Sequence, residues 1–391
     1  MPDFYRIHRL PPYVFAEVNA MKAAARAGGT DIVDLGMGNP DGPPAAHVVE
    51  KLAEVARNPK AHGYSASKGI AGLRRAQAGY YARRFGVDVD PESEVVVTLG
   101  SKEGLANLAQ AITAPGDVVL APNPSYPIHQ FGFIIAGAAI RSLPAAPGPD
   151  FFTSLERAVR FTVPKPSVLV IGYPSNPTAY IADLSFYEQL VAFAREHRLW
   201  VISDLAYAEI YFGETPTPSI LQVPGAKDVA IEFTSMSKTY SMAGWRIGFA
   251  VGNRELIAAL TRVKSYLDYG AFTPVQAAAV AALNGPQDIV EANRRLYRTR
   301  RDCLVESFGR AGWEIPPPAA SMFAWAPIPQ PFQDMGSVEF AKRLLAEAHV
   351  AVAPGVGFGE EGEGFVRIAL VENEQRLRQA ARGVKRMLAG R

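Results

Sequence analysis

A lysine surrounded by hydroxyl groups is the feature of this sequence with the clearest chemical potential. Lys238 lies in the stretch EFTSMSKTYSMAGWRIGFAVG, close to Ser235 and Ser237 and eight residues before Arg246. A buried lysine with a lowered pKa can form a Schiff base with a carbonyl compound. Serine hydroxyls and an arginine can bind a phosphate. Taken alone, however, such a lysine is much more often a solvated residue in an ordinary turn.

Other polar groups follow apolar segments that we expect to be strands. These groups are Ser101 and Lys102 after VVVTL, Tyr126 after VVLA, Asn176 after VLVIG, and Asp204 and Tyr207 after LWVIS. A helix that begins with a serine and a lysine is a natural anion site, although an N-cap serine beside a solvated lysine is as good an interpretation. A buried carboxylate needs a partner, so Asp204 is either functional or held by a salt bridge or a helix cap.

The segments between these groups predict the architecture. Apolar strands are expected at 95–99, 118–121, 138–143, 168–172, 199–203, 229–233 and 247–252, and helices at 13–26, 46–57, 69–85, 101–113, 125–136, 152–160 and 182–197. Strands that are apolar on both faces and alternate with amphipathic helices indicate an α/β domain with a mostly parallel sheet covered by helices. In such sheets a ligand binds beyond the carboxyl ends of the strands, where the polar groups lie.

Composition and charge narrow the class of protein. The chain has 391 residues, 48% of them hydrophobic and 20% charged, which suits a protein of about two domains with a substantial core. The net charge of +2 favours no nucleic acid or anionic membrane as a partner. Cys303 is the single cysteine, and no cluster of metal ligands is apparent. The N-terminal segment lacks the apolar core of a signal peptide, so we expect a cytoplasmic protein.

The order of Asn176, Asp204, Tyr207, Lys238 and Arg246 resembles the fold-type I pyridoxal-phosphate aminotransferases of class I/II. The resemblance extends over essentially the whole chain, from RLPPYVF through MGNPDG, HGYS, VTLGSKEGL, PNPSYP, PSNPTA, SDLAYAEI, SKTYSMAGWRIGF and SYLDYGAFTP to FVRIALVEN. Within this family, the motifs are most similar to those of the bacterial glutamate–pyruvate (alanine) transaminases and the LL-diaminopimelate aminotransferases. It implies a large cofactor domain over 46–285 with a seven-stranded, mostly parallel sheet. It also implies an arm and part of a small domain over 1–45, and the rest of that α+β domain over 286–391.

The resemblance implies a role for each polar group around the cofactor, pyridoxal 5'-phosphate. Lys238 would bind it as a Schiff base and carry the proton of the substrate, and Asp204 would pair with the pyridine nitrogen. Tyr207 and Asn176 would contact the ring oxygen, and Tyr126 would stack on the ring. The phosphate would be held by Ser101, Lys102, Ser235, Ser237 and Arg246, together with Tyr64 of a neighbouring subunit, which implies a homodimer.

The substrate site follows from the same resemblance. Arg367, in the late strand FVRIAL, would bind the α-carboxylate with two hydrogen bonds, assisted by Asn176 and the backbone N–H of Gly38. Tyr13 would line the side-chain pocket from the N-terminal arm. The chain departs from many relatives at Ala179, where they have glycine.

We therefore expect a transaminase that moves an amino group between alanine and 2-oxoglutarate by a ping-pong mechanism. No second arginine for a distal carboxylate stands out; Arg262, the tyrosines of SYLDYGAF and the arm around Tyr13 are candidates. Specificity for LL-diaminopimelate, aspartate, or methionine and other apolar amino acids is an alternative, and so is a β-lyase on the same fold. The ligand-sensing domain of a transcription regulator is a non-enzymatic alternative, which would need an attached DNA-binding module.

Overall fold

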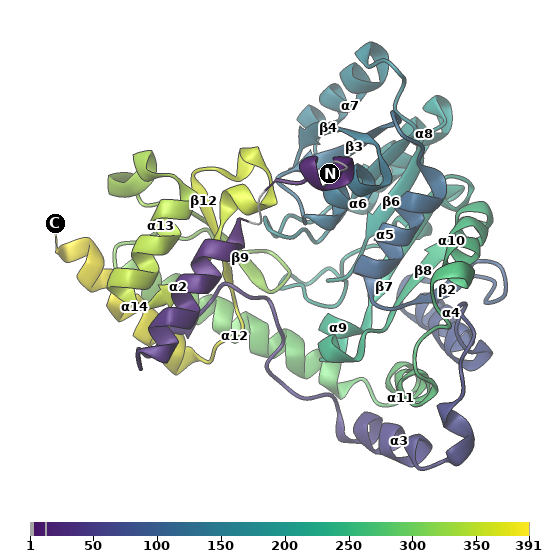
Figure 1. The fold of residues 1–391 in the computed structure, drawn as a ribbon, viewed down its shortest axis with the longest axis horizontal. Coiled ribbons are helices and arrows are strands. Elements are labelled where there is room, and N and C mark those ends of the chain that lie inside the picture. The colour runs from purple at the N-terminus through teal and green to yellow at the C-terminus, as the bar shows by residue number, and fades with distance from the viewer. Residues whose placement is uncertain (1–3, 12–13, 391) are drawn as a thin grey trace.

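A seven-stranded sheet forms the centre of the larger part of the molecule in the computed structural model, which describes residues 4–11 and 14–390 (Figure 1). Its strands, in spatial order, are β2 (Val95–Thr98), β8 (Gly248–Gly252), β7 (Ala230–Ser235), β6 (Trp200–Asp204), β5 (Val168–Ile171), β3 (Val118–Asn123) and β4 (Ala139–Pro144). Only β8 runs antiparallel to its neighbours. The predicted α/β fold with a mostly parallel seven-stranded sheet is confirmed.

Helices cover both faces of this sheet because its strands are apolar on both faces. One face packs against α3 (Ala46–Ala56), α4 (Ala71–Phe85), α7 (Pro149–Phe161), α8 (Leu184–His197) and α11 (Thr273–Asn284). The other packs against α5 (Ser101–Ile112), α6 (Ile128–Ala136) and α10 (Arg254–Leu267). Alternate strand residues join the two cores: Leu169 and Ile171 lie on the first face, and Val168 and Val170 on the second.

A separate core lies beside the sheet, on the left of Figure 1, and combines a segment that includes Val18, Val33 and Leu35 with the C-terminal part of the chain. It contains β9 (Phe323–Pro327), β11 (Ala353–Pro354) and β12 (Phe365–Ala369) with α12 (Asp288–Arg310), α13 (Ser337–Arg343) and α14 (Glu374–Ala389). Near the N-terminus, α2 (Phe15–Ala27) packs on α13, and β1 (Val33–Asp34) pairs with β10 (Val350–Ala351). The short α1 (Tyr5–His8) instead contacts α6 on the other part of the molecule, where Arg9 donates hydrogen bonds to the carbonyls of Ile134 and Ala138.

Short turns complete the chain. They are η1 (Pro59–His62), η2 (Ile220–Gln222), η3 (Ala226–Asp228), the single turn α9 (Met236–Thr239), η4 (Ala243–Trp245), η5 (Gln330–Met335), the π turn η6 (Leu344–Ala348), η7 (Gly355–Phe358) and η8 (Glu360–Gly362). Within residues 4–11 and 14–390 we find no helix that is long and apolar enough to cross a bilayer.

The elements differ from the sequence predictions in a few places. The helix expected at 125–136 begins at Ile128, because Tyr126 precedes a proline and is therefore disfavoured from the helical conformation. Two helices, α1 and α10, were not predicted. Asn253 begins α10, since its side-chain oxygen accepts hydrogen bonds from the backbone N–H groups of Glu255 and Leu256.

Candidate active site

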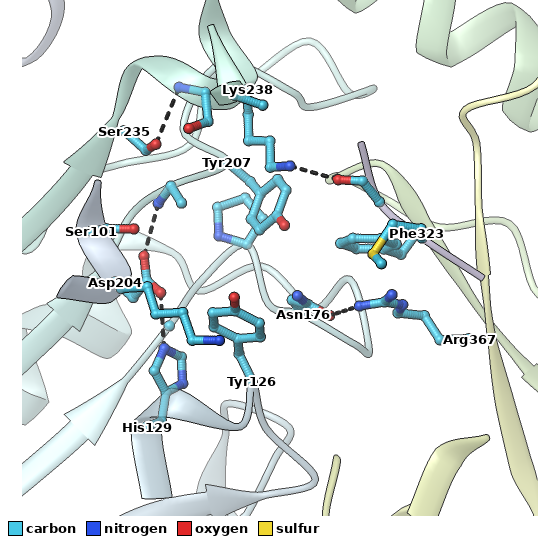
Figure 2. Close-up of a pocket in the computed structure, with 18 of the residues that line it drawn as sticks. Ser101, Tyr126, His129, Asn176, Asp204, Tyr207, Ser235, Lys238, Phe323 and Arg367 are labelled. Carbon is cyan, nitrogen blue, oxygen red and sulfur yellow. Dashed lines mark hydrogen bonds and ion pairs between the residues drawn. The ribbon is translucent and has the colours of Figure 1, made fainter. Parts of the chain in front are cut away.

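A cavity of about 230 Å³ lies between the carboxyl ends of the sheet strands and the strands of the smaller core (Figure 2). Nearly all the residues predicted for the site line it: Gly38, Ser101, Lys102, Tyr126, Asn176, Asp204, Tyr207, Ser235, Ser237, Lys238, Arg246 and Arg367. Most of them follow parallel strands, which end on the same side of the sheet. Arg246 lies just before the antiparallel β8, and Gly38 and Arg367 come from the loop after β1 and the strands of the smaller core, respectively.

Lys238 enters the cavity from α9, the single turn that follows β7. Ser235 caps this turn, because its hydroxyl accepts a hydrogen bond from the backbone N–H of Ser237 at 3.1 Å. The Lys238 Nζ donates to the carbonyl of Gly38 at 2.6 Å. Burial, and after it the positive charges of Arg367 and Arg246, lower the pKa of Lys238 to about 8. Its amine is therefore neutral, and able to act as a nucleophile or base, at a much lower pH than that of a free lysine.

Asp204 is the last residue of β6, and a histidine contacts its carboxylate and orients it. The Asp204 Oδ2 lies 2.9 Å from Nε2 of His129, and Oδ1 accepts a hydrogen bond from the N–H of Ala206 at 3.2 Å. Both side chains are buried. Sequence reasoning missed His129; the available signal was its place three residues after Tyr126, which puts it near Tyr126 at the start of α6. A carboxylate held this way can pair with a protonated ring nitrogen in the cavity.

An anion-binding region forms where α5 begins. Arg246 lies across the helix start, with Nη1 donating to the carbonyl of Ala243 at 2.7 Å and Nη2 to that of Leu99 at 3.4 Å. Only glycine fits at position 100, because a Cβ there would lie 2.1 Å from Nη2 of Arg246 and because its φ is +84°. The hydroxyls of Ser101, Ser235 and Ser237 line the same cavity. Hydroxyls, a guanidinium and a helix N-terminus together suit a phosphate.

A second, buried guanidinium lies on the opposite side of the cavity from these groups (Figure 2). Arg367 of β12 donates from Nη1 to the side-chain oxygen of Asn176 and from Nη2 to the carbonyl of Gly36, both at 2.8 Å. The ring of Phe323, which sequence reasoning also missed, lies 4.0 Å from the guanidinium carbon. A guanidinium in this setting can bind a carboxylate through two parallel hydrogen bonds.

Two tyrosines project into the cavity between these charged groups (Figure 2). Burial, together with the nearby Tyr126 hydroxyl, holds the pKa of Tyr207 well above its usual value. Its hydroxyl therefore stays protonated and can donate a hydrogen bond. The ring of Tyr126 presents an aromatic surface, and the Lys102 Nζ lies 5.9 Å from its centroid.

Tyr64 is a predicted site residue that does not line this cavity. Tyr64 is 88% exposed, and its ring lies 4.6 Å from that of the exposed Tyr269. Its predicted contact with a neighbouring subunit stays a prediction, because the structure contains one chain. Tyr13 lies outside the described residues. Ala179 adopts the left-handed conformation with φ of 59°, which glycine adopts without strain.

Comparison with known proteins agrees with this arrangement of groups. Residues 30–384 match the family model described as aminotransferase class I and II. The chain is 56% identical over 384 residues to the glutamate-pyruvate aminotransferase AlaC of Escherichia coli K12, covering 98% of this chain and 93% of the relative. It is 43% identical over 388 residues to the LL-diaminopimelate aminotransferase of Moorella thermoacetica, covering 99% of each. Among solved structures, a double mutant of Thermus thermophilus aspartate aminotransferase superposes with a TM-score of 0.90 at 31% identity, covering 99% of this chain and 100% of that one.

Proposed function

Because the chain belongs to the class I and II aminotransferases, which depend on pyridoxal phosphate, we propose that it transfers an amino group between alanine and 2-oxoglutarate. The similarity to AlaC supports this pair of substrates, since that relative is named a glutamate-pyruvate aminotransferase. The observation in the structure that carries the proposal is the set of cations around the cavity. Lys102, Lys238, Arg246 and Arg367 all line the cavity, which is enough for the cofactor, an α-carboxylate and a second carboxylate.

The residues of the cavity fit the cofactor group by group. Pyridoxal phosphate carries a carbonyl, a ring nitrogen, a ring oxygen and a phosphate. The neutral amine of Lys238 suits the carbonyl, and the carboxylate of Asp204 suits a protonated ring nitrogen. The Tyr207 hydroxyl is a donor for the ring oxygen. The phosphate is matched by Ser101, Ser235, Ser237 and Arg246 at the start of α5.

The bound cofactor supplies an electron sink for the bond that breaks at the substrate Cα. The side chains provide the rest of the chemistry. Asp204 would keep the ring nitrogen protonated, and His129 fixes the direction of its carboxylate. Lys238 would take the proton from the substrate Cα and would give it back to complete the transfer, a role for which a base with a pKa of about 8 is well matched.

Lys102 is the cationic side chain of the cavity to which the preceding roles assign no partner. Arg246 lies across the phosphate region, Arg367 suits the α-carboxylate, and Lys238 binds the cofactor. Within the described residues, no hydrogen bond or ion pair to a side chain or carbonyl is recorded for the Lys102 Nζ, which lies beside the Tyr126 ring. We therefore assign Lys102 to the distal carboxylate of glutamate and 2-oxoglutarate, in place of the phosphate role implied by the sequence.

A longer amino acid is the second candidate, and a specific feature favours it. Lys102 also borders a groove of about 750 Å³. The N-terminal arm, the start of α6 and η7 line this groove, mostly with apolar side chains such as Leu10, Val14 and Phe131. A side chain longer than that of glutamate would extend into the groove past Lys102. The similarity to an LL-diaminopimelate aminotransferase is consistent with this alternative.

The test combines a substrate panel with one variant. We expect alanine with 2-oxoglutarate to have the highest kcat/KM among donor and acceptor pairs, with pyruvate as a product. Lys102→Met should lower kcat/KM for 2-oxoglutarate by about 100-fold, since it leaves the distal carboxylate without its partner, and should change the alanine half-reaction by less than about threefold. Lys165→Met, at an exposed lysine that precedes β5 and does not line the cavity, is the matched control.

Three outcomes would contradict the proposal. A preference for LL-diaminopimelate or aspartate over alanine would show that alanine is not the main amino donor. Release of ammonia from alanine in place of amino transfer would indicate a lyase. If Lys102→Met lowers kcat/KM equally for alanine and for 2-oxoglutarate, Lys102 does not bind the distal carboxylate.

A further inference from the structure

Two phenylalanine rings lie against the guanidinium of Arg367. The guanidinium carbon is 4.0 Å from the ring centroid of Phe323 and 4.7 Å from that of Phe358. Phe323 belongs to β9 and Phe358 to η7, and both are at most 3% exposed. Aromatic rings attract a cation electrostatically, most strongly where water is excluded. These rings therefore cover part of Arg367 that would otherwise be solvated.

The polar edge of the guanidinium is held at the same time. Asn176 and the carbonyl of Gly36 each accept one hydrogen bond from it at 2.8 Å. The four contacts come from four segments: β9, η7, the loop after β5 and the loop after β1. Rotation of the Arg367 side chain would break several of them together. The direction of its N–H groups is thus set before a substrate binds.

Each phenylalanine also contacts another part of the site, Phe323 through its ring and Phe358 through its backbone carbonyl. Phe323 leaves no room for a side chain at Gly38, where a Cβ would lie 2.4 Å from the ring, and it packs edge-on against Tyr207 at 5.7 Å. The carbonyl of Phe358 accepts a hydrogen bond from the backbone N–H of Ser125 at 2.9 Å. Ser125 immediately precedes Tyr126. Phe358 therefore connects Arg367 of the smaller core to the loop that places Tyr126 on the sheet side.

We propose that Phe323 and Phe358 are positioning residues that orient Arg367 for the α-carboxylate and so determine how strongly this enzyme prefers substrates that carry one. The inference rests on the proposed use of Arg367 for that carboxylate and not on the identity of the amino donor. Phe358 does not line the cavity itself, but its ring contacts Arg367, which does. Low polarity around the guanidinium strengthens its pairing with an anion.

The experiment compares two reagents that capture the carbonyl of the bound cofactor, one with a carboxylate and one without. Aminooxyacetate carries the carboxylate, and O-methylhydroxylamine lacks it. The ratio of their second-order rate constants with the holoenzyme, followed by the cofactor absorbance, measures the carboxylate preference independently of turnover. We expect Phe358→Leu to lower the ratio about tenfold and Phe323→Leu to lower it further. Arg367→Met, as the reference, should bring it close to one.

The matched control is Phe340→Leu. Phe340 is equally buried in the smaller core but packs against Trp313 and Phe332, away from Arg367, so the ratio should not change. Phe358→Tyr, which keeps the ring, should restore most of the preference. Phe358→Met, which keeps the side-chain volume without the ring, gives the same comparison if the leucine variant fails to fold.

The outcomes separate this inference from the proposed function. An unchanged ratio in Phe358→Leu would overturn the inference. This includes the case in which both reagents slow by the same factor, which would indicate a purely structural role for Phe358. A wild-type ratio near one would remove Arg367 itself from carboxylate binding. None of these results depends on whether alanine is the preferred donor, which the substrate panel decides.

Discussion

Two lysines, Lys238 and Lys264, are shielded from solvent to different degrees and have different charged neighbours. Lys264 of α10 has a side chain with no exposed surface, and its Nζ lies 3.1 Å from Glu103 Oε1 and 2.8 Å from Asp268 Oδ2. Lys238 faces a cavity, donates to the carbonyl of Gly38, and has two arginines as its charged neighbours. Burial alone therefore does not make a lysine reactive. The partners differ: Lys264 lies between two carboxylates, whereas the cations near Lys238 favour its neutral amine.

Two buried carboxylates on neighbouring strands repeat this contrast. Glu232 of β7 has no exposed surface, and four donors close around it. Asp204 of β6 is held by His129 and one backbone N–H, and it lines the cavity. A polar group enclosed by its own protein stabilises or strains the fold, whereas one that faces a cavity can act on a ligand.

Replacing Lys238 should produce the largest effect. We expect Lys238→Ala to lower kcat by at least about 10⁴-fold, because it removes both the amine that binds the cofactor and the base. The thermal stability of the cofactor-free protein should not fall, since the fold lowers the pKa of Lys238 and thus disfavours its charged form. Steady-state rates and melting curves measure the two effects. Turnover within tenfold of the wild type would contradict the assignment of Lys238.

Replacing Lys264 should reverse the pattern. Lys264→Met leaves Glu103 and Asp268 without their cation, and breaking a buried pair in this way costs about 3–5 kcal/mol of folding free energy. Activity per folded molecule should stay within about threefold, because Lys264 does not line the cavity. Chemical denaturation gives the stability, and cofactor absorbance gives the folded fraction. The double variant Lys264→Met with Asp268→Asn should recover part of the loss; a stable single variant would show that the pair is not needed.

The sequence predicted best what depends on local pattern. Apolar strands alternating with amphipathic helices specified the sheet and its coverage, and the polar residues after those strands meet in one cavity because parallel strands end at one edge. The prediction did not extend to α10, whose start depends on the short cap provided by Asn253.

Residues that act through long-range packing could not be predicted in the same way. His129 looks like an ordinary helical histidine until the fold places it 2.9 Å from Asp204, across 75 positions of sequence. Phe323 and Phe358 look like core residues, and their contact with Arg367 appears only when β9, η7 and β12 come together. Charged and polar residues could be recognised as site candidates from their side-chain type. The apolar residues that position them could not, because they are indistinguishable in sequence from other core residues.

The smallest expected effect concerns pH and Glu232. Burial raises the pKa of Glu232 to about 7 from its ordinary value of 4.5, so between these values the folded protein holds a proton that the unfolded chain has released. The free energy of unfolding should therefore fall as pH rises from about 5 to about 8. In Glu232→Gln this fall should be smaller by about 1–3 kcal/mol when unfolding is measured across the same range.

Glu94→Gln is the control. The pKa of Glu94 is lowered, so its contribution is lost only in more acidic solution and the difference from wild type should stay constant over the same range. Parallel curves for wild type and Glu232→Gln would mean that Glu232 stays ionised throughout and that its four donors outweigh its burial.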